Sequence, residues 1–208
     1  MKPIYRVGHI ACSIVARVGF NLKVYGRENL IEEGPAIVAS NHQSYLDPPM
    51  IGCVHRRELY YLARSTLFDQ RILGWVLRHV NVIPVDRERG DIAAIKTIIR
   101  LIKDGRRMII FPEGTRSTNG QLQQARSGLG MVIAKTFAPV VPVRVFGTFE
   151  ALPKTGRLKL LPVSIVVGKP LRFPERDIAS RDRELYQKLS DRVMEEIAKL
   201  EIPKGSDG

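Results

Sequence analysis

The apolar and polar residues of the chain follow two alternating patterns, short apolar runs and longer segments with helical spacing. The apolar runs predict strands at residues 36–40, 58–63, 82–85, 107–111 and 140–146. The helical spacing predicts helices at residues 71–80, 91–103, 128–137 and 181–200. Because strands separated by helices are typical of α/β proteins, we expect a single domain with a largely parallel or mixed sheet flanked by helices.

The segment at residues 91–103 shows the helical pattern most clearly. Its isoleucines recur on one face, whereas Lys96, Arg100 and Lys103 fall on the other, and Gly105 is suited to end the helix. Residues 158–167 are predicted to be extended, and a proline within them favours an edge strand or a bulge. The chain has no internal repeat and no convincing linker, which favours one domain.

The first twenty residues are predicted to form an amphipathic helix in front of the domain. Its apolar stripe consists of Ile4, Val7, Ala11, Ile14 and Val18. Its polar face carries Lys2, Arg6, His9, Ser13 and Arg17. These polar residues interrupt the run too often for a membrane-crossing helix, which needs about 20 mostly apolar residues, and the segment is a poor match to a secretory signal. The helix therefore either lies at a membrane interface or packs its apolar face on the domain.

These features divide the chain into three parts. We expect an amphipathic helix at residues 1–20, which is a membrane-interface helix in the first of these alternatives, a folded domain at residues 21–201 and a disordered tail at residues 202–208. The length of 208 residues is sufficient for one domain with a sizeable core. A composition of 44% hydrophobic and 26% charged residues is ordinary for a globular protein.

The charge balance is the unusual feature of the composition. The chain has 33 lysines and arginines against 21 acidic residues, which gives a net charge of +12. Such a surface attracts the phosphates of nucleic acid, of an anionic membrane or of a phosphorylated substrate. A nucleic-acid-binding module is disfavoured, because the basic residues are dispersed and are not interleaved with aromatic residues. The two cysteines, Cys12 and Cys53, form no disulfide framework, which indicates a reducing compartment. Neither belongs to a metal-type cluster, which disfavours a structural zinc site.

Candidate chemistry begins at residues 41–47, Asn-His-Gln-Ser-Tyr-Leu-Asp, directly after the first predicted strand. Asp47 precedes two prolines and is placed to be the N-cap of a helix. The motif thus lies on a strand-to-helix connection, where open α/β sheets bind ligands. A separation of five residues on a turn can bring His42 and Asp47 together, so that the carboxylate orients a general base. From this motif alone, a structural histidine remains an alternative.

A second motif, Phe-Pro-Glu-Gly-Thr-Arg-Ser at residues 111–117, follows the apolar run at residues 107–110. In combination the two motifs resemble those of the glycerolipid acyltransferase family. Weaker similarities at residues 82–87 and 140–143 occur in the same order, and the resemblance extends over residues 24–170. It implies an enzyme that transfers an acyl group from an acyl thioester to the free hydroxyl of 1-acylglycerol 3-phosphate, making phosphatidic acid for phospholipid synthesis.

The resemblance also implies roles for particular residues. His42 is the expected general base and Asp47 the carboxylate that orients it. Ser44 is expected to form a hydrogen bond within the turn, with no acyl-enzyme. The expected substrate-binding residues, around the phosphate of the acceptor, are Arg87, Glu113, Gly114, Thr115 and Arg116.

The expected reaction needs no cofactor and no metal, because its co-substrate, acyl-coenzyme A or an acylated carrier protein, is already activated. The expected partners are a lysophospholipid acceptor and an anionic membrane surface, on whose cytoplasmic face the protein is peripheral or monotopic, and no nucleic acid. Arg64 stands where many family members carry lysine, and residues 124–128 replace the Phe-Lys that many carry before a glycine. These departures leave glycerol 3-phosphate or another lysolipid as alternative acceptors. A non-catalytic basic module that binds membranes or nucleic acid is the remote alternative.

Overall fold

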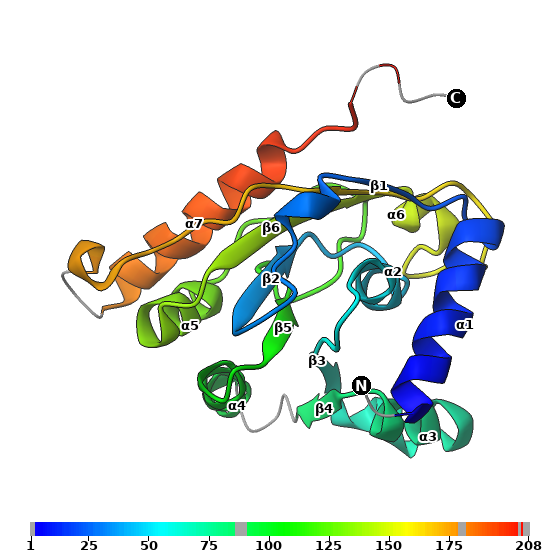
Figure 1. Cartoon of the computed structure of the whole chain (residues 1–208), viewed down its shortest axis with the longest axis horizontal. Coiled ribbons are helices and arrows are strands. Elements are labelled where there is room, and N and C mark those ends of the chain that lie inside the picture. The colour runs from blue at the N-terminus through cyan, green and yellow to red at the C-terminus, as the bar shows by residue number, and fades with distance from the viewer. Residues whose placement is uncertain (1–2, 86–90, 179–181, 204, 206–208) are drawn as a thin grey trace.

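The computed structural model in Figure 1 describes residues 3–85, 91–178, 182–203 and 205. Its strands are β1 (Lys23–Tyr25), β2 (Ala36–Ser40), β3 (Tyr61–Arg64), β4 (Val82–Val85), β5 (Arg107–Ile110), β6 (Val140–Phe146) and β7 (Ser164–Val167). Its helices are α1 (Pro3–Gly19), α2 (Asp47–Val54), α3 (Arg71–His79), α4 (Asp91–Lys103), α5 (Gly128–Thr136), α6 (Thr148–Ala151) and α7 (Arg183–Lys199). The predicted α/β fold is confirmed.

Five strands form the main sheet in the order β1-β7-β6-β2-β5. All neighbours are parallel except β6 and β7, so the sheet is mixed. The parallel pair β3 and β4 forms a second, smaller sheet. Tyr60, just before β3, joins the two sheets, because its N–H donates to the carbonyl of Arg107 and its carbonyl accepts from the N–H of Ile109.

The alternation of side chains along the strands produces a core on each face of the main sheet. In β2, Ile37 packs with the buried residues of α4, α5 and α7, whereas Val38 packs with those of α1 and α2. Figure 1 shows the same arrangement, with α4, α5 and α7 on one side of the sheet and α1 and α2 on the other. The domain therefore has three layers, and all of β2 is buried at its centre.

Two predicted elements are shorter than expected. The strand predicted at residues 58–63 begins only at Tyr61. The extended segment at residues 158–167 forms a strand only from Ser164, because its first part leaves the sheet and exposes Leu158 and Leu160. The predicted tail at residues 202–208 lies partly outside the described residues, so its disorder stays a prediction.

The orientation of α1 distinguishes between the two interpretations of its apolar stripe. The stripe faces away from the domain, with 68% of Val7, 57% of Ile14 and 82% of Val18 exposed. The other side of the helix contacts the domain, where Ala16 is buried and the Nε2–H of His9 donates to the carbonyl of His55 at 2.8 Å. The alternative in which the apolar face packs on the domain is therefore wrong.

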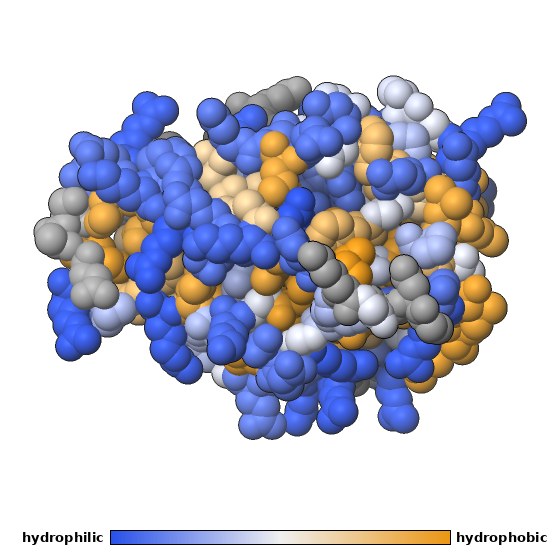
Figure 2. Space-filling view, turned by 90° about the horizontal axis from the view of Figure 1, so that it is seen from above, coloured by the Kyte–Doolittle hydropathy of each residue, from blue (hydrophilic) through white to orange (hydrophobic). Residues whose placement is uncertain are grey.

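The exposed stripe is part of a wider apolar surface. The described residues 72–76 of α3 and 158–161 also expose large apolar side chains. A Cβ built on Gly8 of α1 would lie 3.8 Å from Val80, just after α3, and one on Gly19 would lie 3.4 Å from Leu160. In Figure 2, apolar side chains gather at the end of the molecule where α1 lies, on the right. None of the described helices is long and apolar enough to span a bilayer.

Candidate active site

The topology of the sheet brings the two sequence motifs together. Strands β2 and β5 are parallel neighbours, with Ala39 opposite Ile110 near their carboxyl ends. The first motif directly follows β2 and the second directly follows β5. Because the carboxyl ends of parallel neighbours lie at the same edge of a sheet, residues some seventy positions apart in the sequence share one site.

The pairing of His42 with Asp47 is the centre of this site. The Nδ1 of His42 lies 2.8 Å from Oδ2 of Asp47, as the spacing on a turn predicted. The same carboxylate oxygen accepts from the N–H groups of Gln43 at 2.7 Å and Ser44 at 2.8 Å, and Oδ1 accepts from the hydroxyl of Thr148. The fully buried carboxylate is thus surrounded by donors, which stabilise its charged form and fix its direction.

The expectation that Asp47 is an N-cap is wrong. Helix α2 begins at Asp47 itself, and the residue at its N-cap position, Leu46, makes no capping hydrogen bond with its side chain. The carboxylate of Asp47 turns back toward the preceding loop instead of forward to the helix. The donors on that loop and His42 together outcompete the free N–H groups of the first helical turn.

The imidazole of His42 is held between the carboxylate and an aromatic ring. It stacks on Phe111 with 3.9 Å between ring centroids and 16° between planes. The hydrogen bond to Asp47 assigns the proton to Nδ1, which leaves the lone pair of a neutral imidazole on Nε2. The side chain is 18% exposed, so the ring remains open to a small reactant.

The loop that carries His42 is anchored to β6 by its neighbouring polar side chains. The amide of Asn41 donates to the carbonyl of Val145 and accepts from the N–H of the same residue. Gln43 also donates to the Val145 carbonyl. The hydroxyl of Ser44 donates to the carbonyl of Leu152 and accepts from the N–H of Leu46, which is the hydrogen bond within the turn that was expected.

Glu113 links the two motifs. Its carboxylate is 3% exposed and accepts from the N–H of His42 at 3.0 Å and from the amide of Gln123 at 2.7 Å. The N–H of Ser117 donates to the carbonyl of His42 at 2.8 Å. Burial raises the pKa of the Glu113 carboxyl, while the hydrogen bonds from His42 and Gln123 act in the opposite direction. This carboxylate holds the histidine loop in place, and its expected role in binding the substrate stays a prediction.

Arg116 packs over an aromatic residue of the first motif. Its guanidinium carbon is 3.5 Å from the ring centroid of Tyr45, and its Nη1 is buried with no hydrogen-bond partner in the described part of the chain. A fixed guanidinium with an unfilled N–H is suited to an anionic oxygen. Arg87, the other predicted arginine, lies outside the described residues.

The rest of the second motif forms a tight loop. Gly114 has a φ of +68°, a left-handed conformation that favours glycine. A Cβ at this position would lie 2.9 Å from Cδ of Arg126, so the side chain of Arg126 extends over the loop. The carbonyl of Thr115 accepts from Gln123 at 3.2 Å.

Three residues of the site were not predicted to have a role there. Tyr45 and Phe111 belong to the two motifs, but their contacts with Arg116 and His42 became visible only in the fold. Thr148 lies outside both motifs. Thr148 comes 101 residues after the carboxylate to which it donates. The one available signal was its position just after β6, because β6 pairs with β2 and therefore ends near the same edge of the sheet.

This fold and site define an α/β protein with a histidine–carboxylate pair at the carboxyl edge of its sheet. The profile of the family described as Acyltransferase matches residues 21–146, and the chain belongs to this family.

Relatives of this chain share one named activity. The chain is 31% identical to the chloroplastic 1-acyl-sn-glycerol-3-phosphate acyltransferase LPAT1 of Arabidopsis thaliana, over 76% of this chain and 46% of the relative. It is 28% identical to a 1-acyl-sn-glycerol-3-phosphate acyltransferase of Bacillus subtilis, over 95% of this chain and 99% of the relative. The chain thus spans about half the length of the plant relatives and nearly all of the bacterial one.

A solved structure has the same fold along almost the whole chain. The crystal structure of the 1-acyl-sn-glycerophosphate (LPA) acyltransferase PlsC from Thermotoga maritima superposes with a TM-score of 0.70 and 25% identity. The match covers 98% of this chain and 86% of the other.

The role of Glu113 predicts a loss of stability when it is removed. Glu113→Ala leaves the N–H of His42 without its acceptor, which costs about 1–3 kcal/mol for a buried group. Glu113→Gln retains an acceptor and should lose less. Glu150→Ala, at an exposed position, is the matched control. Urea unfolding measures all three variants, and equal stabilities for Glu113→Ala and Glu150→Ala would contradict the assignment.

The raised pKa of Glu113 adds a pH dependence to the same experiment. Because the folded-state pKa lies above the unfolded value, the stability that Glu113 contributes is present below the unfolded pKa and is lost as pH rises through the folded pKa. Wild type should therefore lose stability relative to Glu113→Gln as pH rises through the carboxyl range. A constant difference between the two proteins across this range would contradict the prediction.

Proposed function

We propose that the protein transfers an acyl group from an acyl thioester to the free hydroxyl of 1-acylglycerol 3-phosphate, forming phosphatidic acid for phospholipid synthesis. The observation that carries this proposal is the 2.8 Å contact between His42 and a buried, fully bonded carboxylate, next to an arginine with an unfilled N–H. Membership of the Acyltransferase family and the names of its relatives support the same reaction. Glycerol 3-phosphate or another lysolipid is the alternative acceptor.

In the proposed reaction, His42 is the general base. Its Nε2 takes the proton of the acceptor hydroxyl as the hydroxyl oxygen attacks the thioester carbonyl. A carbon–oxygen bond forms, the carbon–sulfur bond breaks, and the proton passes from Nε2 to the departing thiolate. Asp47 holds the ring in the required tautomer and stabilises the imidazolium in between. No protein nucleophile is needed, which agrees with the hydrogen bonds that occupy the Ser44 hydroxyl.

The second motif is proposed to bind the phosphate of the acceptor. Arg116 supplies the fixed guanidinium. Gly114 and Thr115 form a loop whose backbone can come close to the phosphate, because glycine has no side chain. Arg87 is proposed as a second cation from outside the described residues. Glu113 supports this site by accepting a hydrogen bond from the N–H of His42. The donor is proposed to be acyl-coenzyme A or an acylated carrier protein, with no further cofactor.

The exposed stripe of α1 supports binding to a membrane, where the acceptor resides. An amphipathic helix with an unpartnered apolar face and flanking basic residues is typical of proteins that lie on an anionic interface. We therefore assign residues 1–20 to the interface, residues 21–201 to the catalytic domain and residues 202–208 to a tail. The proposed location is the cytoplasmic face of a membrane, with peripheral or monotopic attachment.

The first test is acyl transfer to a panel of acceptors with both donor types. Wild type should acylate 1-acylglycerol 3-phosphate faster than glycerol 3-phosphate or an uncharged lysolipid. His42→Ala should lower turnover by about 10²–10⁴-fold, because it removes the general base. Circular dichroism serves as the control for folding. Near-wild-type turnover in a folded His42→Ala protein would exclude the mechanism.

The phosphate contact predicts a selective effect of Arg116→Ala. Losing a hydrogen bond to a charged group costs about 1.5–3 kcal/mol, or about one to two decades in affinity. The apparent KM for the acceptor should therefore rise by this factor while that for the thioester changes little. Arg116→Lys keeps the charge but loses the planar fork, so its apparent KM for the acceptor should lie between those of wild type and Arg116→Ala. Equal effects on both substrates would contradict the assignment.

The membrane role of α1 can be tested with substitutions that leave its packed side intact. Val7→Ser/Ile14→Ser/Val18→Ser should weaken binding to anionic vesicles at least about tenfold. Each substitution removes apolar surface that the wild-type helix would transfer from water into the membrane. Turnover of vesicle-embedded acceptor should fall, whereas a short-chain, water-soluble acceptor should react as before. Ile202→Ser, distant in sequence and also exposed, is the control. Unchanged vesicle binding in the triple variant would refute the interface role.

A further inference from the structure

One flank of α1 carries a second feature, distinct from its apolar stripe. Arg6, Ile10, Ser13 and Arg17 recur at spacings of four and three, so they lie along one side of the helix. The first two line a hollow beside the amino-terminal half of α1, and the last two line a hollow beside its carboxyl-terminal half. Both hollows have their opposite wall near the end of α2.

The larger hollow has a volume of about 580 Å³ and a strongly basic lining. Its cationic and imidazole side chains are those of Arg6, His9, Arg56, Arg57, Arg106 and Arg107. Glu58 supplies the carboxylate among the described lining residues. The hollow lies at the amino end of β5, and a strand rises by about 3.3 Å per residue, so about 13 Å of backbone separates Arg107 from Phe111 beside His42. It is therefore a separate site from the candidate active site.

Hydrogen bonds fix the backbone at Arg56 and Arg57 and the guanidinium of Arg107. The N–H groups of Arg56 and Arg57 donate to the carboxylate of Glu32, which fixes the turn after α2. The guanidinium of Arg107 donates to the main-chain carbonyls of Glu32 and Glu58 and keeps a buried Nε–H without a partner in the described ranges. The arginine is thus anchored by neutral groups, and its charge remains uncompensated by these bonds.

The remaining ion pairs neutralise this charge only slightly. Arg57 pairs with Glu33 at 3.3 Å, but both side chains are largely exposed, and such pairs contribute little. Among the residues that the structure describes, Arg6, Arg56 and Arg106 have no carboxylate partner, and Arg106 instead lies over the ring of Tyr60. Several guanidinium groups therefore face one hollow without matching acids.

A buried histidine lies between the two hollows in the sequence. His55 lies in sequence between the residues that line the two hollows, and both of its ring nitrogens are buried without a hydrogen-bond partner in the described chain. Burial is the main cause that lowers its pKa to about 4; Arg107, Arg27 and His9 act in the same direction, and Glu32 opposes them. The ring is therefore neutral near neutral pH, and the positive charge around the hollows comes from the arginines.

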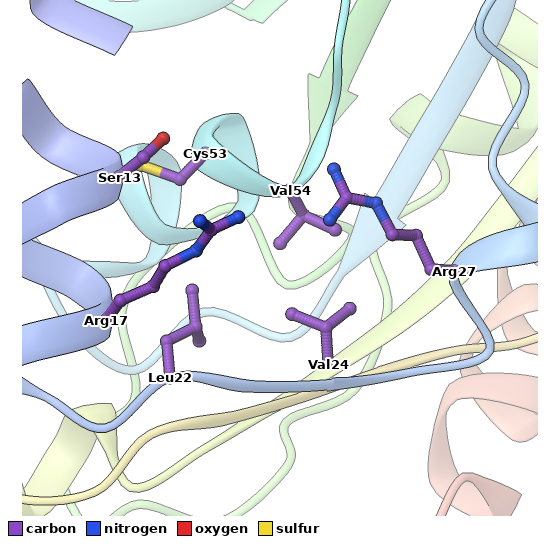
Figure 3. Close-up of a pocket in the computed structure, with 7 residues that line it drawn as sticks. All are labelled: Ser13, Arg17, Leu22, Val24, Arg27, Cys53 and Val54. Atoms are coloured by element: carbon purple, nitrogen blue, oxygen red, sulfur yellow. The ribbon is translucent and has the colours of Figure 1, made fainter. Parts of the chain in front are cut away.

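The smaller hollow, farther along α1, is also lined by arginine side chains. It has a volume of about 200 Å³, and Figure 3 shows Arg17 from α1 and Arg27 from η1 (Arg27–Asn29) extending toward Val54 from two sides. Leu22 and Val24 form an apolar part of its lining. Guanidinium groups can bind the phosphate of a lipid, and the apolar surface beside them can contact the adjoining apolar part of the same lipid.

We propose that this basic flank of α1 binds the phosphate group of an anionic membrane lipid, at a site separate from that of the reacting acceptor. Arginine forks match phosphate oxygens, and the neighbouring apolar stripe would place the hollows at the depth of the lipid headgroups. A bound headgroup would join α1 to the domain through residues of both. The inference rests on the proposed interface role of α1 but not on the proposed acyl transfer.

The experiment compares two double variants that both leave α1 unchanged. Arg56→Gln/Arg106→Gln removes two charges from the hollow, and Arg172→Gln/Arg183→Gln removes two exposed charges near α7. Binding is measured to vesicles of phosphatidylcholine with and without phosphatidylglycerol, in the absence of any thioester. Because a basic residue at an anionic surface contributes about fivefold in affinity, the first variant should lose about 25-fold in binding to the anionic vesicles. The control variant should lose less than about threefold.

Free phosphate is the other source of the same chemistry, and a thermal-unfolding arm distinguishes it. Inorganic phosphate that raises the unfolding temperature of wild type, but not of Arg56→Gln/Arg106→Gln, would support a phosphate site filled from solution. A selective loss of anionic-vesicle binding supports the lipid headgroup. The proposal would be overturned if both double variants lost vesicle binding equally. It would also be overturned if Arg56→Gln/Arg106→Gln lost neither vesicle binding nor the stabilisation by phosphate. Because no turnover is measured, this outcome is independent of whether the protein transfers acyl groups.

Discussion

The buried carboxylate of Asp47 is the constraint on which the rest of the site depends. A charge without water is costly unless donors surround it, and here the donors come from the loop after β2, from α6 and from His42. Satisfying the carboxylate therefore fixes the loop, the position of α6 and the tautomer of the histidine together. Loss of any one donor would leave part of the charge uncompensated, which makes the arrangement cooperative.

A second buried carboxylate, that of Glu113, connects the histidine loop to the segment after the neighbouring strand β5. Glu113 follows β5 and accepts the N–H of His42, so the two motifs are joined through the backbone rather than through the reactive side chains. The ring of His42 remains free to act, with Phe111 behind it and Nε2 available. The parallel pairing of β2 with β5 is what makes this contact between distant motifs unavoidable.

The sequence predicted those features that follow from local pattern. The strand at residues 140–146 and the helix at residues 91–103 were predicted with their observed bounds, because runs and periodicity determine them directly. The meeting of His42 with Asp47 followed from the length of the turn. The capping role of Asp47 was wrong, because donors that only the folded loop assembles compete for its oxygens, and Thr148 was missed for the same reason.

The orientation of α1 shows a different limit of periodicity. The spacing of residues defines an apolar and a polar face, but not which of them meets the domain. In this protein His9, from the predicted polar face, bonds to the domain, and the apolar stripe is exposed. Amphipathicity normally directs the apolar face inward, so the reversed orientation is informative about an external apolar partner.

The protonation of the His42 ring tests the central claim most directly. Nitrogen-15 NMR of the histidine rings, assigned with a His42→Gln variant, reports which nitrogen carries the proton in the neutral form. The account predicts a proton on Nδ1 and a bare Nε2 in wild type, and a shift toward the other tautomer in Asp47→Asn. A proton on Nε2 in wild type, or identical spectra in the two proteins, would contradict the claim that Asp47 prepares His42 to act as a base.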